Sequence, residues 1–212
     1  MKIIYATLSL ILLLLSGNTF AQTVFEGKVV FNVEANGTKQ VMDYYAKDKK
    51  FRMEIPDQGG YIIFDTQSFN MYIVMDEQKM YMVSSMNSST TGSAGSITKT
   101  GETKKILGYD CEKFLFEQDG SKGESWMTKG LGSFMFFSQS QTELADWQKE
   151  ILNEGYFPLQ MTEYDDNGNA ESTYNVIEVT PKELSSDMFA VPASYQKLDM
   201  PNMGNIKDMM GK

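Results

Sequence analysis

The sequence predicts a mainly β fold in which consecutive antiparallel strands form one sheet and helices are few. Apolar residues alternate with a period of two through most of residues 24–86. Short turn-forming segments separate the alternating stretches, and only one segment of the mature chain has clear helical spacing. Runs of strands joined by short turns are typical of an antiparallel meander.

The first two expected strands form a hairpin. In residues 24–34, "VFEGKVVFNVE", apolar and polar side chains alternate, which is typical of a strand with one buried face. Asn36 and Gly37 tolerate positive φ, and strand-like residues follow at 38–46, so a tight turn is expected between them. Further strands are expected over residues 51–55, 61–65, 69–75 and 79–86.

Two of these strands are apolar on both faces. In the segments "YIIF" at 61–64 and "MYIVM" at 71–75, apolar or aromatic residues occupy both the odd and the even positions. A strand of an antiparallel sheet usually leaves one face in water, so here both faces must be covered. Either a helix of the same chain packs there to complete a core, or a curved sheet shelters something apolar on its concave side.

The second half of the chain contains a loop, more strands and one helix. Residues 87–100, rich in Ser, Thr and Gly, are expected to form a surface loop. A strand, or a strand pair bent at Gly108, follows, and Asn167-Gly168 predicts a second hairpin. Residues 140–155 predict the helix, since Ser140 and Glu143 form a capping box and Gly155 suits a C-terminal cap.

Residues 1–21 are expected to be a secretory signal peptide. Lys2 precedes an apolar run over 3–15, and small residues end at Ala21. The run is shorter than the roughly 20 residues of a spanning helix, so the mature chain is not expected to span a membrane. The alternative is an uncleaved anchor. The expected divisions are a signal peptide at 1–21, one domain at 22–198 and a flexible Met-rich tail at 199–212.

Composition excludes several classes of function. The formal net charge of −9 disfavours nucleic-acid binding, which depends on neutralising phosphates. The chain has no histidine, so imidazole bases, Ser-His or Cys-His pairs and ordinary zinc sites are excluded. Phosphate-binding loops and nucleophile elbows are also absent from the sequence. No enzyme activity, cofactor or metal is therefore expected, and a pair of carboxylates acting as acid and base is the alternative.

The single cysteine, Cys111, follows the turn-like Gly108-Tyr109-Asp110. Free cysteine is among the most frequently buried residue types, so packing within the sheet is expected. The alternative is an exposed thiol that pairs between molecules.

Two segments are the most specific of several with a family resemblance: "I-x-G-Y-x-C-x-K", at 106–113, and "MFAVPASY", at 188–195. Together the segments resemble a small secreted bacterial domain of unknown function that is similar to the outer-membrane lipoprotein carrier superfamily. The resemblance covers residues 24–198. It implies an antiparallel, unclosed β half-barrel with a helical or loop lid over its concave face, located in the periplasm, with secretion or outer-membrane association as alternatives. Carriers of that superfamily hold acyl chains in the hollow.

We therefore expect a non-catalytic binding protein whose concave sheet face shelters a lipid, an acyl chain or another hydrophobic small molecule. A structural or interaction protein with a filled core, contacting an envelope protein, is the alternative. An enzyme is a third interpretation. The pocket candidates are the apolar and aromatic residues of the doubly apolar strands, later strands and the helix: Ile63, Phe64, Met71, Ile73, Met75, Met82, Phe114, Phe116, Phe136 and Trp147.

Overall fold

The described part of the chain forms one open sheet of twelve strands. The computed structural model describes residues 25–55, 59–85, 95–118, 120–132, 134 and 146–198. The strands are β1 (Gly27–Ala35), β2 (Thr38–Lys47), β3 (Lys50–Ile55), β4 (Gly60–Asp65), β5 (Asn70–Met75), β6 (Met80–Ser85), β7 (Gly95–Ile106), β8 (Tyr109–Gln118), β9 (Ser121–Lys129), β10 (Tyr156–Tyr164), β11 (Ala170–Pro181) and β12 (Gln196–Lys197). The helical elements are α1 (Asp146–Glu154) and the 3₁₀ turn η1 (Ser186–Phe189).

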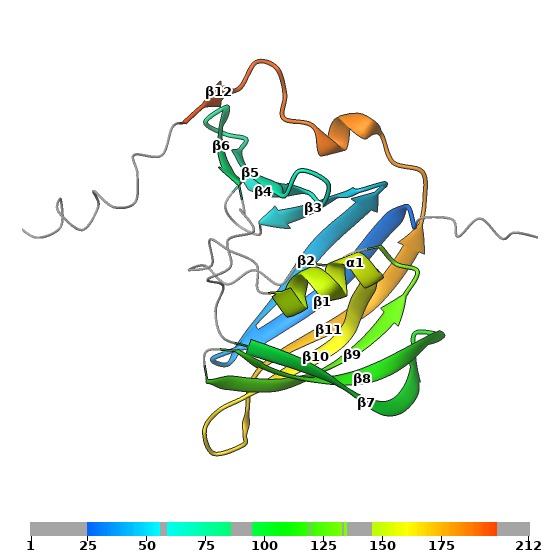
Figure 1. The fold of residues 1–212 in the computed structure, drawn as a ribbon. Helices are drawn as coiled ribbons and strands as arrows, with labels where there is room; N and C mark the ends of the chain where they lie inside the picture. The colour runs from blue at the N-terminus through cyan, green and yellow to red at the C-terminus, as the bar shows by residue number, and fades with distance from the viewer. Residues whose placement is uncertain are drawn as a thin grey trace, which may run out of the picture.

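The sheet curls into an unclosed half-barrel, which confirms the predicted fold class. Its strand order is β12-β6-β5-β4-β3-β2-β1-β11-β10-β9-β8-β7, so β7 and β12 stand at opposite ends. All pairings are antiparallel except the short parallel pairing of β12 with β6. Figure 1 shows the β3–β6 wing (residues 50–85) above and the β7–β9 wing (residues 95–129) below, with β1 and β11 between them.

The two predicted hairpins are confirmed, and glycine conformation explains both. Asn36 and Gly37 adopt φ of 53° and 73°, and β1 and β2 pair in register on either side of them. Gly168, with φ of 81°, lies in the turn between β10 and β11. Leu107 and Gly108 also have positive φ, so the stretch around Gly108 is a strand pair rather than one bent strand.

The prediction of a surface loop over residues 87–100 is wrong for residues 95–100, which begin β7. Ile97 pairs with Phe116 and packs against a buried cluster, so its apolar side chain holds the polar segment in the sheet. A register shift between Lys99 and Thr103, with Gly101 at φ of 85°, interrupts the ladder. The composition of residues 95–100 predicted a loop because the segment is rich in polar residues. In the structure these polar side chains are mostly exposed on a strand.

The predicted helix is present as α1, which lies in front of β1 and β11 in Figure 1. Gly155, at φ of 70°, donates its N–H to the carbonyl of Leu152 at 3.1 Å, as expected of a C-terminal cap. Ile151 and Leu152 of α1 are buried against the sheet. The predicted capping box, the signal peptide at 1–21 and the tail at 199–212 lie outside the described residues. No helix in the described ranges is long and apolar enough to cross a membrane.

A C-terminal strap, residues 182–198, crosses the outer face of the β3–β6 wing. Val191 and Tyr195 of the strap pack against a buried cluster of Tyr61, Ile63 and Val74. At the end of the strap, β12 pairs with β6, and Gln196 donates its N–H to the carbonyl of Lys79 at 2.9 Å. Both strands lie at the top of Figure 1. The chain therefore covers one of the two apolar faces predicted for these strands with its own C-terminal segment.

Candidate functional site

The inner face of the β3–β6 wing carries a row of methionine and isoleucine side chains. Phe64 and Met71 pair directly and pack in the main core, and residues two positions along each strand share their face. We call this set the inner shelf; its members pair across neighbouring strands and are all half-buried: Met53, Ile62, Ile73, Met75, Met80 and Met82. Of these, only Met53 packs against a buried cluster of the described residues.

The centre of the half-barrel is filled by aromatic rings. Tyr44 and Phe51 stack at 5.2 Å between ring centroids, and Phe51 stacks in turn on Phe64 at 5.2 Å. Phe134 approaches Phe157 at 5.2 Å and Tyr44 at 5.5 Å. These rings fill the middle of the half-barrel.

A cavity of about 390 Å³, which we call the end cavity, lies between the C-terminus of α1 and the turns at the edge of the sheet. Its apolar lining comes from Phe25, Ala46, Phe51, Phe69 and Leu152. Asp48, Lys49, Lys50 and Glu154 contribute charged groups. Sequence reasoning missed this cavity, because its lining comes from the residue Phe25 before β1, two turns, the residues after β9, and α1.

The predicted pocket residues fall into separate places. Five lie on the inner face of the β3–β6 wing, where Phe64 is buried and the others are half-buried: Phe64, Met71, Ile73, Met75 and Met82. Ile63 points to the outer face, where it lines a smaller cavity of about 170 Å³ beside the strap residues Phe189 and Val191. Because Ile63 and Phe64 are adjacent in a strand, they cannot share one pocket wall.

The remaining candidates belong to the β7–β9 wing and α1. Phe114 packs with Met127, Ile151 and Tyr156, and Trp147 packs against that cluster. Phe116 shares the face of Phe114 and lies against Gly123, where a Cβ atom would approach the Phe116 ring to 2.3 Å. Phe136 lies outside the described residues. A pocket role for all ten residues stays a prediction.

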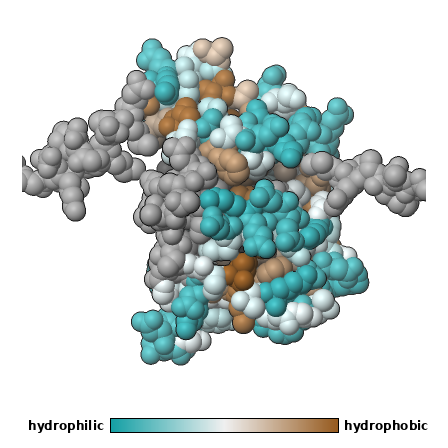
Figure 2. Space-filling model, viewed as in Figure 1, coloured by the Kyte–Doolittle hydropathy of each residue, from teal (hydrophilic) through white to brown (hydrophobic). Residues whose placement is uncertain are grey.

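Figure 2 shows where apolar and polar side chains gather on one face of the molecule. Apolar surface gathers over the β4–β6 region at the top and below α1, while the exposed side of α1 is hydrophilic. The helix therefore presents a polar surface outward and buries Ile151 and Leu152 inward.

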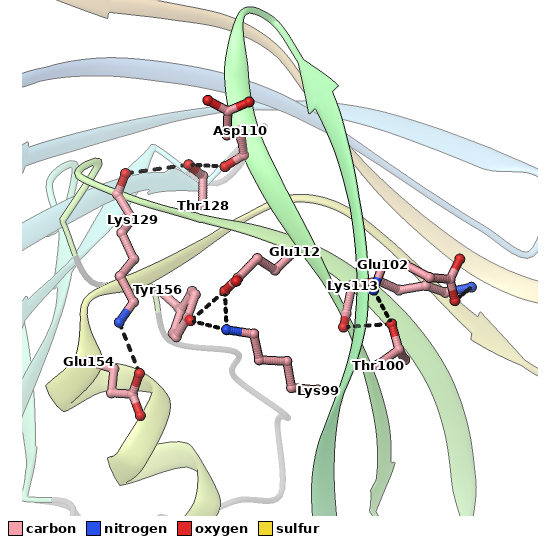
Figure 3. A network of polar contacts seen from close by, with 10 residues as sticks. All are labelled: Lys99, Thr100, Glu102, Asp110, Glu112, Lys113, Thr128, Lys129, Glu154 and Tyr156. Carbon is pink, nitrogen blue, oxygen red and sulfur yellow. Dashed lines mark hydrogen bonds and ion pairs between the residues drawn. The ribbon is translucent and has the colours of Figure 1, made fainter.

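A polar network joins α1 to the β7–β9 wing (Figure 3). Lys99 contacts the carboxylate of Glu112 at 2.6 Å, and the Tyr156 hydroxyl donates to the same carboxylate at 2.6 Å. Lys129 pairs with Glu154, the last residue of α1, at 3.0 Å. The hydrogen bond from Lys99, followed by that from Tyr156, lowers the pKa of Glu112, and burial raises the pKa of Tyr156. Each cation has an anionic partner, so the network is suited to holding α1 rather than to proton transfer.

Cys111 is fully buried, which confirms the predicted packing. Its Sγ lies 3.6 Å from the carbonyl oxygen of Tyr109. Burial raises the pKa of the thiol, so the nucleophilic thiolate is disfavoured. Across the described ranges, histidine, cysteine and carboxylate side chains form no group of three or more that could hold a metal ion.

These features define an open antiparallel half-barrel with a helix in its hollow and an apolar inner face on one wing. The model of the family described as Domain of unknown function (DUF4412) matches residues 25–195, and the chain belongs to this family. The predicted resemblance to a family of this description is thereby confirmed. No curated protein matches the chain.

Solved structures support the fold. An uncharacterized conserved protein from Thermus thermophilus is 12% identical, with a TM-score of 0.54 over 84% of this chain and 91% of that chain. A structure of PNGF-II is 16% identical, with a TM-score of 0.54 over 89% of this chain; this chain spans only 33% of it. A putative outer membrane lipoprotein-sorting protein domain from Vibrio parahaemolyticus is 10% identical, with a TM-score of 0.33 over 77% of this chain and 87% of that chain. At these identities the first two show the fold alone.

Proposed function

We propose that the protein is a non-catalytic binding protein of the bacterial periplasm that shelters a lipid, an acyl chain or another hydrophobic molecule in its hollow. The observation that carries this proposal is the inner shelf. Its methionine and isoleucine side chains stay half-buried on the inner face, while the strap seals the outer face of the same strands. Buried apolar surface stabilises a complex by about 25 cal/mol per Å², so a half-covered apolar shelf favours an apolar ligand.

The residue types of the inner shelf support a ligand of variable shape. Four of its six members are methionines, whose flexible and polarizable side chains adapt to irregular apolar surfaces. The end cavity adds about 390 Å³, lined by both apolar side chains and charged groups. Ligand pockets are commonly about 300–1,000 Å³, so the end cavity has the volume of a small-ligand site.

A fluorescent fatty acid titrated into the purified protein tests the proposal. We expect the wild-type protein to bind it and Ile73→Glu to weaken binding by roughly tenfold or more, because a carboxylate on the shelf must be desolvated. Ile177→Glu is the matched control, since Ile177 also lies on a strand but is 48% exposed. Equal loss in both variants, or no binding by the wild-type protein, would count against the shelf as the binding surface.

A second candidate function is an interaction protein whose centre is simply packed. The stacked and edge-to-face rings of Tyr44, Phe51, Phe134 and Phe157 favour it, because they fill the middle of the half-barrel without a ligand. In that case an envelope protein would contact the inner shelf or a sheet edge. Two results together would favour this second function. The wild-type protein would not bind the fatty acid, and it would capture an envelope protein that Ile73→Glu does not capture.

A further inference from the structure

Two hydrogen-bond donors are buried in the hollow without a partner. In the described part of the chain, the buried side-chain polar atoms that lack one are the hydroxyl of Tyr174 and Nε1 of Trp147. Other polar groups of the interior are satisfied; for example, the Thr128 hydroxyl donates to the carbonyl of Asp110 at 2.9 Å. A buried unpaired polar group costs about 1–3 kcal/mol, so each such group in a native protein requires an explanation.

Tyr174 lies on β11 in the aromatic centre of the half-barrel. The residue is only 4% exposed, and its ring centroid is 4.6 Å from that of Phe31. Its neighbours across the strands are Val33 and Met161, so no polar side chain stands directly opposite it on either strand. Burial raises the pKa of Tyr174 far above its usual value, so its phenol stays protonated and remains a donor.

Phe134 fills the space beside Tyr174. Its ring centroid is 5.4 Å from that of Tyr174 and 6.1 Å from that of Phe31. Phe134 follows β9 and belongs to none of the strands, whereas Phe31 and Tyr174 are fixed within the sheet. Of the two rings that contact Tyr174, Phe134 is therefore the one that lies outside the strands.

Trp147 supplies the second unpaired donor from the helical side of the hollow. It lies on α1 and packs against the cluster of Phe114, Met127, Ile151 and Tyr156. An indole N–H can only donate, whereas a phenol can donate or accept. The chemistry that complements both groups is a hydrogen-bond acceptor.

We propose that the ligand of the hollow carries a carbonyl acceptor, as acyl esters and fatty acids do, which accepts the hydroxyl hydrogen of Tyr174 in the space that the Phe134 ring now fills. The inference rests on the proposed hydrophobic-binding function and specifies the ligand class for it. An apolar chain lies along the inner face, and the carbonyl replaces the missing partner of Tyr174. A pure hydrocarbon leaves that hydroxyl unpaired.

The test compares two ligands of equal heavy-atom number, methyl dodecanoate and pentadecane, as competitors of a bound fluorescent fatty acid. Because the hydrocarbon leaves water more favourably than the ester does, the readout is the ratio of the ester's affinity to the hydrocarbon's affinity in each variant. Tyr174→Phe removes the hydroxyl alone, and we expect it to lower this ratio by roughly tenfold, the effect of one buried hydrogen bond, while still binding both ligands. Tyr45→Phe is the matched control, because the Tyr45 hydroxyl already bonds to Asp43 at 3.3 Å on β2. Dodecanoate as a third competitor distinguishes a free carboxylate from an ester.

The failures of the two proposals are distinguishable. If neither competitor displaces the probe from the wild-type protein, the hydrophobic-binding function fails and the ligand class with it. If the ratio of the ester's affinity to the hydrocarbon's affinity is the same in the wild-type protein and in Tyr174→Phe, the binding function stands and the role of Tyr174 is overturned. Thermal unfolding of ligand-free Tyr174→Phe gives an independent readout: an unchanged or higher Tm is expected, whereas a clear fall in Tm would show that the hydroxyl already has a partner without ligand.

Discussion

The two wings of the sheet differ in what covers their faces. The described part of the β7–β9 wing is covered with ion pairs: Lys99–Glu112, Lys105–Asp110, Lys113–Glu124 and Lys129–Glu154. Within the described β3–β6 wing, Arg52–Glu54 is the one ion pair, and both faces are largely apolar. Water can cover the first wing, whereas the strap covers the outer face of the second wing and its inner shelf stays half-buried.

The edges of the sheet differ in the same sense. β7 presents Lys99, Lys104 and Lys105 along a mostly exposed strand that a bulge interrupts, which discourages pairing with another chain. β6, by contrast, is covered in part by β12 of the same chain. The apolar wing thus relies on the chain's own C-terminal segment where the polar wing relies on charge.

The largest expected effect of a single substitution falls in the buried row that joins the β3–β6 wing to the core. Phe64 is fully buried and stacks on Phe51 at 5.2 Å. We expect Phe64→Ala to lower the free energy of unfolding by about 3–5 kcal/mol, through lost transfer energy and a residual cavity. Leu115→Ala in the other wing, at a residue 47% exposed, should change it by about 0.5 kcal/mol or less. Urea unfolding measures both, and comparable losses would contradict the difference in burial between these two residues.

The second prediction compares the two faces of the apolar wing. Ile63 is 1% exposed beneath the strap, whereas Ile73 is half-buried on the inner shelf. We expect Ile63→Ala to cost about 2–4 kcal/mol and Ile73→Ala about 1 kcal/mol in ligand-free protein. Equal losses in urea unfolding would mean that the inner shelf is already as well covered as the outer face.

The third prediction concerns pH and the β7–β9 wing. The hydrogen bond from Lys99 lowers the pKa of Glu112 below its unfolded value of 4.5. A group whose folded pKa is depressed stabilises the fold above its unfolded pKa and loses that contribution as pH falls through the folded pKa. Glu112→Gln should therefore flatten the stability profile below about pH 4.5 and leave the slope at neutral pH unchanged.

Urea midpoints collected from about pH 6 to about pH 3 check this dependence. Asp146→Asn, which removes a carboxylate that is 93% exposed and pairs with Lys149, is the control. A Glu112→Gln profile parallel to that of the wild-type protein would show that the ion pair does not stabilise the wing.

The smallest effect is expected at Cys111. A fully buried thiol with a raised pKa should react with a thiol reagent only as fast as the protein opens, and at the ordinary rate in denaturant. Mass spectrometry of the labelled protein follows the reaction. Rapid modification without denaturant would contradict the packed environment of β8.

Local patterns predicted much of this fold because they act over a few residues. Alternation gave the strands of residues 27–85, and Asn36-Gly37 and Asn167-Gly168 gave two hairpins. The doubly apolar strands predicted that both faces are covered. Alternation could not say that Val191 and Tyr195, more than 100 residues along the chain, cover the outer one.

The candidate site was less predictable for the same reason. The sequence marked Ile73 and Met82 as apolar residues of neighbouring strands, but only the register between these strands places them side by side on one face. Phe25, Phe69 and Leu152 meet in the end cavity because turns and a helix end converge there, and no local spacing encodes that meeting. Likewise, the unpaired hydroxyl of Tyr174 depends on the absence of polar neighbours that only the folded core reveals.

Native mass spectrometry of the protein, purified gently from a cell envelope extract without detergent, tests the central claim most directly. The account predicts a species heavier than the polypeptide, from which organic solvent extraction releases an acyl compound, and predicts that Ile73→Glu carries less of it than Ile177→Glu. A single species at the mass of the bare polypeptide, together with no uptake of added fatty acid, would contradict the claim that the hollow shelters a hydrophobic ligand.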